Sequence, residues 1–185
     1  EGLAIEDQTL TVNSSDLYDE DGIGDLNYQW LADNQVIEGA TSKSFTLTQN
    51  EVGKVITVHV SFTDLYDNDE LIVSEPTILV TNVDNDPTGV VTIDGIAKED
   101  QALVVNTSNL VDEDGIDTST FNYQWLADGE IIQGATGREY TLTQNEVGKV
   151  ITVNVTYTDM YNALESVTSG PTEPIGNSND DPTGV

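Results

Sequence analysis

The chain has no cysteine, and its five lysine and arginine residues oppose 34 aspartate and glutamate residues, which gives a net charge of −29 over 185 residues. Without cysteine there is no disulfide bond and no thiolate metal ligand. A negative field of this size repels phosphate, so we expect no nucleic-acid partner and no attraction to anionic membrane surfaces. The partners that such a chain attracts are cations.

Two further absences reduce the range of functions that we expect for the chain. No run of apolar residues approaches the roughly 20 that a membrane helix needs, so we expect no membrane insertion by this segment. The only histidine is His59, and the second copy of its motif carries Asn154 at the same place. A catalytic base needs an orienting partner and a nearby nucleophile, and the sequence places neither beside this histidine. We therefore expect no enzymatic activity.

An internal repeat organises the chain. The segment NYQWLAD occurs at residues 27–33 and again 95 positions later, at 122–128, and LTQNEVGKVITV recurs with the same offset. DPTGV closes both copies. Self-similarity of this kind indicates tandem structural units. We divide the chain into a first repeat, residues 1–86, that lacks the start of its first strand, and a second repeat, residues 87–185, of which 177–185 form a linker without a following domain.

Short alternating runs within each copy predict strands. Every second residue from Ile56 to Phe62 is apolar, and the second copy repeats this pattern from Ile151 to Tyr157. About seven short strands in a unit of this size, with one tryptophan, are typical of an immunoglobulin-like sandwich. We therefore predict an all-β chain of two tandem immunoglobulin-like β-sandwiches. The residues expected in the two cores are Tyr28, Trp30, Ile56 and Val58, and Tyr123, Trp125, Ile151 and Val153.

Acidic loops should gather where the two predicted sandwiches join. In such a fold, two turns of the first domain and two loops of the second domain face the short linker between them. The candidate metal ligands at this junction are Glu6, Asp7 and Glu51 from turns of the first repeat, Asn82, Asp84, Asn85 and Asp86 from the linker, and Asp112, Asp114, Asp159 and Glu165 from loops of the second repeat.

The two outer ends should carry incomplete versions of this site. At the outer end of the first repeat, the acidic group has no preceding linker. At the outer end of the second repeat, the acidic group has no following domain. We expect both groups to bind metal more weakly than the junction. Their members are Asp19, Asp21 and Asp64 at one end and Glu99, Asp100, Glu146, Asp180 and Asp181 at the other.

Calcium is the cation that this ligand set predicts. Ca²⁺ takes six to eight oxygen ligands from carboxylates, amides and backbone carbonyls in flexible geometry. Transition metals prefer nitrogen and sulfur ligands, which the chain lacks apart from one histidine. The alternative is that these residues only form solvated turns, since Asp, Asn and Gly are common turn formers. Their grouping at one predicted end in both copies favours the metal site.

The combined motifs resemble a known family. YQW, GAT, LTQNEVGK and DPTG occur in both copies, and this pattern is similar to the tandem immunoglobulin-like extender repeats of large bacterial surface adhesins of the RTX type. The resemblance covers both copies almost end to end. It implies an extracellular position on the bacterial surface, where calcium in the linkers keeps a long array extended and the array holds a ligand-binding tip away from the cell.

The linker VDNDP is also similar to the calcium-binding linker of cadherins. That resemblance implies shared ions on Glu6, Glu51, Asp84, Asp86 and Asp112. The loop sequence DLYDNDE of the first copy departs from DMYNALE in the second, so Asp67 and Asp69 have no acidic counterpart.

Two other functions remain open from the sequence. A module that binds carbohydrate or ice would show an exposed aromatic row or a regular threonine array, and FTLT and YTLT are too short for the latter. An accessory domain of a secreted enzyme would be recognised only from flanking sequence.

Overall fold

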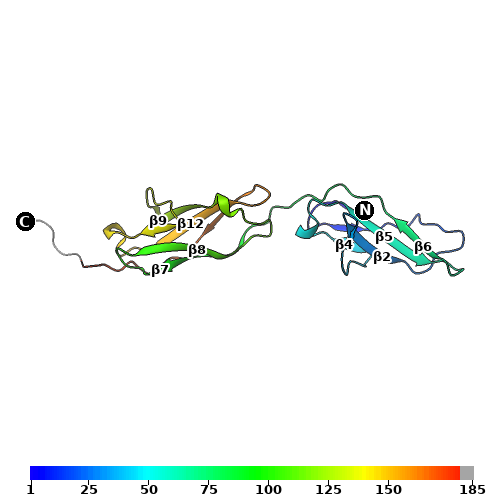
Figure 1. Cartoon of the computed structure of the whole chain (residues 1–185), viewed down its shortest axis with the longest axis horizontal. Helices are drawn as coiled ribbons and strands as arrows, with labels where there is room; N and C mark the ends of the chain where they lie inside the picture. The colour runs from blue at the N-terminus through cyan, green and yellow to red at the C-terminus, as the bar shows by residue number, and fades with distance from the viewer. Residues whose placement is uncertain (180–185) are drawn as a thin grey trace, which may run out of the picture. The chain divides into compact units, whose positions relative to one another are not determined.

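The structure is a computed structural model that describes residues 1–179. It confirms the prediction of an all-β protein (Figure 1). The pairs of neighbouring strands in its sheets are antiparallel. The chain divides into two compact units, Glu1–Val83 and Asp84–Val185. The division falls after Val83, three residues before the repeat boundary that the sequence predicts at Asp86.

Unit 1 contains two sheets. One has four strands in the order β3-β2-β5-β6, and the other pairs β1 with β4. Between β4 and β5, the turn Gln49–Glu51 forms a 3-10 helix, because Thr48 and Glu51 cap each other's backbone in a capping box. The strands are β1 (Thr9–Thr11), β2 (Asn27–Ala32), β3 (Gln35–Val36), β4 (Ser44–Thr46), β5 (Ile56–Thr63) and β6 (Asp69–Val73).

Unit 2 repeats this plan with one more strand. Its four-stranded sheet has the order β10-β9-β12-β13, and its second sheet has the order β11-β8-β7. The turn Gln144–Glu146 carries the same capping box as its counterpart in unit 1. The strands are β7 (Thr88–Gly95), β8 (Ala102–Val111), β9 (Asn122–Ala127), β10 (Glu130–Ile131), β11 (Glu139–Thr141), β12 (Ile151–Thr158) and β13 (Leu164–Thr168).

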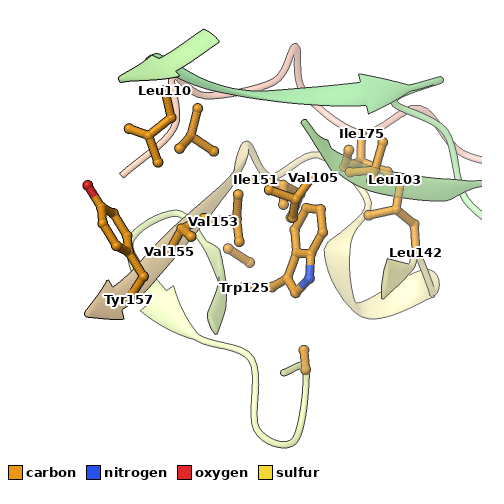
Figure 2. Packing of buried hydrophobic residues seen from close by; sticks show 13 residues of the cluster. Leu103, Val105, Leu110, Trp125, Leu142, Ile151, Val153, Val155, Tyr157 and Ile175 are labelled. Carbon is orange, nitrogen blue, oxygen red and sulfur yellow. The ribbon is translucent and has the colours of Figure 1, made fainter. Parts of the chain in front are cut away.

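Each unit encloses its own apolar core, as the alternating pattern predicted. In β5, the apolar residues from Ile56 to Phe62 are buried, and the equivalent residues of β12 are almost fully inaccessible to solvent. Trp125 lies at the centre of the core of unit 2, between residues of both sheets (Figure 2). The indole N–H of Trp30 donates to the carbonyl oxygen of Ser42 at 2.8 Å, which satisfies the one polar atom of a buried ring.

The two cores differ beside the tryptophan. In unit 2, a β-bulge in β7 sets Val91 into the core, where it is 2% exposed. In unit 1, the second sheet has only β1 and β4, and the same side of the core is a hollow of about 270 Å³ lined by Leu10, Trp30 and Val58 among others. Hollows of about 220 and 400 Å³ also lie along β7 in unit 2, but Trp125 is not among their lining residues. The core of unit 2 is therefore closed beside its tryptophan, whereas the hollow of unit 1 reaches Trp30.

Helical structure among the described residues is limited to three 3-10 turns, two of them the capping-box turns and the third Thr118–Thr120. None of them is long or apolar enough to cross a membrane.

We predict that Trp125→Ala destabilises unit 2 by about 3–5 kcal/mol, as a large-to-small change in a closed core. Trp30→Ala should cost unit 1 less, because part of the Trp30 surface already faces a hollow. Urea unfolding followed by two-dimensional NMR would read the two units separately. An equal cost in both units would contradict the difference in closure, and no cost in either would mean that the tryptophans do not support the cores.

Candidate metal centre

Three carboxylates of unit 2 meet at one end of its sheets. One oxygen each from Asp84, Asp114 and Asp159 lies within 4.8 Å of the other two. Asp114 is 2% exposed and Asp159 is 3% exposed, whereas Asp84 is open to solvent. Within residues 1–179, no other three acidic or histidine side chains come together in this way. The group could hold a metal ion, and its members are among those that the sequence predicted for the junction.

The sheet ends bring these residues together. Asp84 precedes β7, Asp114 follows β8, and Asp159 follows β12. The backbone N–H of Met160 donates to the carbonyl oxygen of Asp114 at 3.3 Å, which joins the two loops. The backbone N–H of Asn85 donates to Oδ2 of Asp114 at 2.7 Å, which fixes the segment before β7 on the same loops.

Asp159 has one satisfied oxygen and one unsatisfied oxygen. Its Oδ1 accepts hydrogen bonds from the backbone N–H groups of Tyr161 and Ala163, at 2.9 and 2.7 Å. Its Oδ2 is buried and has no hydrogen-bond partner. The side-chain oxygen of Asn85 is also buried without a partner. A buried oxygen without a donor is costly, and a cation held by the three carboxylates would satisfy Oδ2 of Asp159.

Asp112 is engaged by a tyrosine. The hydroxyl of Tyr157 donates to Oδ2 of Asp112 at 2.6 Å, and the backbone N–H of Asp114 donates to Oδ1 at 2.9 Å. Figure 2 shows the hydroxyl of Tyr157 directed away from Trp125, at the edge of the core. Burial, with the hydrogen bond to Asp112, raises the pKa of Tyr157. Asp112 therefore orients the loop that carries Asp114, and it lies outside the group of three.

The negative charges at this end of unit 2 repel one another. Loss of hydration, followed by the charges of Asp159 and Asp114, raises the pKa of Asp84. Burial, followed by the charge of Asp84, raises the pKa of Glu165. Both shifts mean that ionisation is unfavourable at this end of the unit without a counter-charge. A divalent cation would remove that cost.

Two further predicted ligands, Glu165 and Asp86, also lie outside the group of three. The assignment of Glu165 to a loop is wrong, because it lies in β13, opposite Tyr157 of β12, with 7% of its surface exposed. Asp86 is exposed and is outside the group of three, although its charge contributes to the raised pKa of Asp84.

In unit 1, the predicted turn residues bind backbone. Oε2 of Glu6 accepts the backbone N–H of Val83 at 3.1 Å, and Oε2 of Glu51 accepts the N–H and the hydroxyl of Thr48 at 2.9 and 2.8 Å. Asn82 accepts from the side chain of Gln49 at 3.2 Å. Asp7 is exposed in a left-handed turn at φ 61°. That these residues share ions with unit 2 stays a prediction.

The far end of unit 2 is built in the same way. Glu99 accepts the backbone N–H of Ser178 at 2.9 Å, and Glu146 accepts the N–H and the hydroxyl of Thr143 at 2.9 and 2.7 Å. Asp100 is exposed in a left-handed turn like that of Asp7. The other two predicted ligands of this end, Asp180 and Asp181, lie outside the described residues.

The opposite end of unit 1 carries the counterparts Asp19, Asp21 and Asp64. The backbone N–H of Asp21 donates to Oδ1 of Asp19 at 2.8 Å, which repeats the turn of Asp112 and Asp114. Asp64 is 6% exposed, but its Oδ2 accepts a hydrogen bond from the side-chain amide of Asn68 at 2.9 Å. The end of unit 1 therefore lacks the unsatisfied aspartate oxygen that marks unit 2.

Sequence reasoning missed Tyr157 and Asn68. Both positions differ between the copies, since Tyr157 corresponds to Phe62 and Asn68 to Ala163. The signal that could have found them is the difference between the two copies at these positions.

The chain matches no protein-family model, and no curated protein matches it.

We predict that Asp159→Asn weakens cation binding at least tenfold and stabilises the cation-free protein. The amide keeps the oxygen that accepts from Tyr161 and Ala163, but it removes the repulsion with Asp114, which amounts to at most about 3 kcal/mol for charges about 5 Å apart at an effective dielectric constant near 20. Urea unfolding in a chelator would measure this stability. A cation-free variant that is less stable than the parent would contradict the repulsion described above.

Proposed function

We propose that the chain consists of two immunoglobulin-like extender repeats that act as a calcium-stiffened spacer in an extracellular bacterial adhesin. The spacer holds a ligand-binding tip away from the cell, in adhesion or biofilm formation. Its partners are calcium ions and the neighbouring repeats of the same chain. The proposal makes the chain a monomer and assigns it no catalytic role.

One observation carries the proposal more than any other. Oδ2 of Asp159 is buried without a hydrogen-bond partner, in a group with Asp114 and with Asp84, the residue that follows directly on unit 1 in the chain. A solvated turn would expose this oxygen or supply a donor to it. An ion on the three carboxylates explains both its burial and its lack of a donor.

The donor set favours calcium over other cations. It consists of three carboxylates, and Ca²⁺ accepts carboxylate oxygens in flexible geometry. Mg²⁺ requires near-octahedral geometry and usually keeps several waters. Extracellular calcium modules bind at about 10⁻⁴–10⁻³ M, so a site of this class would be filled outside the cell and empty in the cytosol.

The backbone contacts of the linker support a role in stiffness. The N–H of Val83 is held by Glu6 within unit 1, and the N–H of Asn85 is held by Asp114 within unit 2. Asp84 is the residue between these two anchors. An ion on its carboxylate would restrain the remaining free backbone of the linker, and so couple the motions of the two units.

The sheet orders support the immunoglobulin-like assignment. In unit 2, the third, sixth and seventh strands of such a fold correspond to β9, β12 and β13, which share one sheet. The first, second and fifth strands correspond to β7, β8 and β11, which share the other.

We predict that calcium raises the melting temperature of the chain and makes the two units tumble together. Binding to the folded form stabilises it by about 2.7 kcal/mol at a hundredfold excess of calcium over Kd. Calorimetry would measure the first effect. NMR relaxation would measure the second, as a longer rotational correlation time for each unit in calcium than in chelator.

Asp84→Asn combined with Asp159→Asn should abolish both effects. The matched control is Asp25→Asn combined with Glu38→Gln, which removes two exposed charges of unit 1 and should leave both effects intact. If the parent chain binds calcium but its units tumble independently with and without it, the spacer function is wrong although the metal site is real.

A further inference from the structure

The two units present a loop with the same backbone hydrogen bonds, and the loops differ in the donor to one aspartate oxygen. In unit 1 the loop runs from Asp64 to Asn68, and in unit 2 it runs from Asp159 to Ala163. The first aspartate of each loop accepts two backbone N–H groups on Oδ1, at 2.8 and 2.8 Å in unit 1 and at 2.9 and 2.7 Å in unit 2. The N–H of each aspartate donates to the carbonyl oxygen of the last residue, at 2.9 and 3.1 Å.

The backbone of the two loops also agrees elsewhere. The fourth residue is left-handed in both, with φ 66° at Asp67 and 71° at Asn162. The second residue donates its N–H to the preceding loop at 3.3 Å in both, to the carbonyl oxygen of Asp21 or of Asp114. The loops therefore hold their aspartates by the same backbone contacts, and within the loop the donor to Oδ2 depends on the last side chain.

The difference is at the last residue of the loop. In unit 1, the side-chain amide of Asn68 donates to Oδ2 of Asp64 at 2.9 Å. In unit 2, Ala163 has no polar side chain, and Oδ2 of Asp159 is buried without a partner. The hydrogen bond from Asn68 is also the main cause of the lowered pKa of Asp64.

We propose that Asn68 takes the place of a metal ion in unit 1, and that the residue at this loop position decides whether the end of a unit needs a divalent cation. The amide N–H of asparagine supplies the positive partial charge that the buried oxygen requires. Alanine leaves that oxygen to a cation. Unit 1 is thereby ordered at this end in the absence of metal, whereas unit 2 is completed by it. The inference rests on the proposed function in taking the group of Asp84, Asp114 and Asp159 as a cation site.

The test is Ala163→Asn in the full chain, with Ala163→Leu as a control that adds similar bulk without an amide. We expect Ala163→Asn to weaken calcium binding at the Asp159 site at least tenfold in calorimetric titration, and to reduce the rise in melting temperature that calcium produces. Ala163→Leu should bind calcium within about threefold of the parent chain. In chelator, Ala163→Asn should melt at a higher temperature than the parent, because its amide satisfies Oδ2.

The outcomes separate this inference from the function on which it rests. A parent chain that binds no calcium refutes the metal site. A parent chain that binds calcium, with Ala163→Asn binding equally well or more tightly, refutes the role of the asparagine alone. Equal loss in Ala163→Asn and Ala163→Leu would make the effect one of bulk and would also refute it.

Asn68→Ala gives an independent measurement in unit 1. In chelator, it should speed hydrogen exchange at the backbone N–H groups of Tyr66 and residue 68 at least tenfold, because Asp64 loses the partner of its second oxygen. Calcium should slow this exchange in Asn68→Ala more than in the parent. Exchange that Asn68→Ala leaves unchanged would show that the amide does not hold the loop.

Discussion

Both units depend on one interaction, the hydrogen bond from a backbone N–H to a buried carboxylate. Glu6 and Glu99 hold the last segment of each unit in this way, and Glu51 and Glu146 hold the turn before β5 and β12. Hydrogen bonds to a charged acceptor are stronger than neutral ones, and they lessen the cost of burying the charge. A chain with 34 acidic residues and few basic ones thus uses its anions to fix its loops.

A carboxylate that accepts backbone N–H groups on one oxygen has a second oxygen that also needs a hydrogen-bond donor. The structure shows two kinds of donor to this second oxygen. The side-chain amide of Asn68 reaches Oδ2 of Asp64, and the N–H of Asn85 reaches Oδ2 of Asp114. At Asp159, neither a backbone nor a side-chain donor reaches Oδ2. The metal proposal follows from this one deficit more than from the number of acidic residues, since most of those residues are exposed.

Alternation along the strands made the fold class and the core faces predictable, since Ile56 to Phe62 and Ile151 to Tyr157 are buried at every second residue. The loop positions of the predicted sandwich fold put Asp84, Asp114 and Asp159 in one region, and the structure brings these three together. Sequence could not tell which acids would touch, because single hydrogen bonds decide this. Asp112 is taken up by the hydroxyl of Tyr157, and Glu165 lies in a strand. These outcomes depend on side-chain positions a few ångströms apart, which strand periodicity does not encode.

The pairing of β7 with β8 has a mechanical consequence. The chain enters unit 2 beside Asp114 and leaves it through Gly176, which pairs with Lys98 beyond the other end of β7. A pull on these two points runs along β7, whereas the antiparallel hydrogen bonds to β8 are perpendicular to the strands. Tension therefore loads these bonds in shear, several at once, and does not open them one after another. The bulge at Val91 adds a buried side chain that must leave the core before the strand can slide.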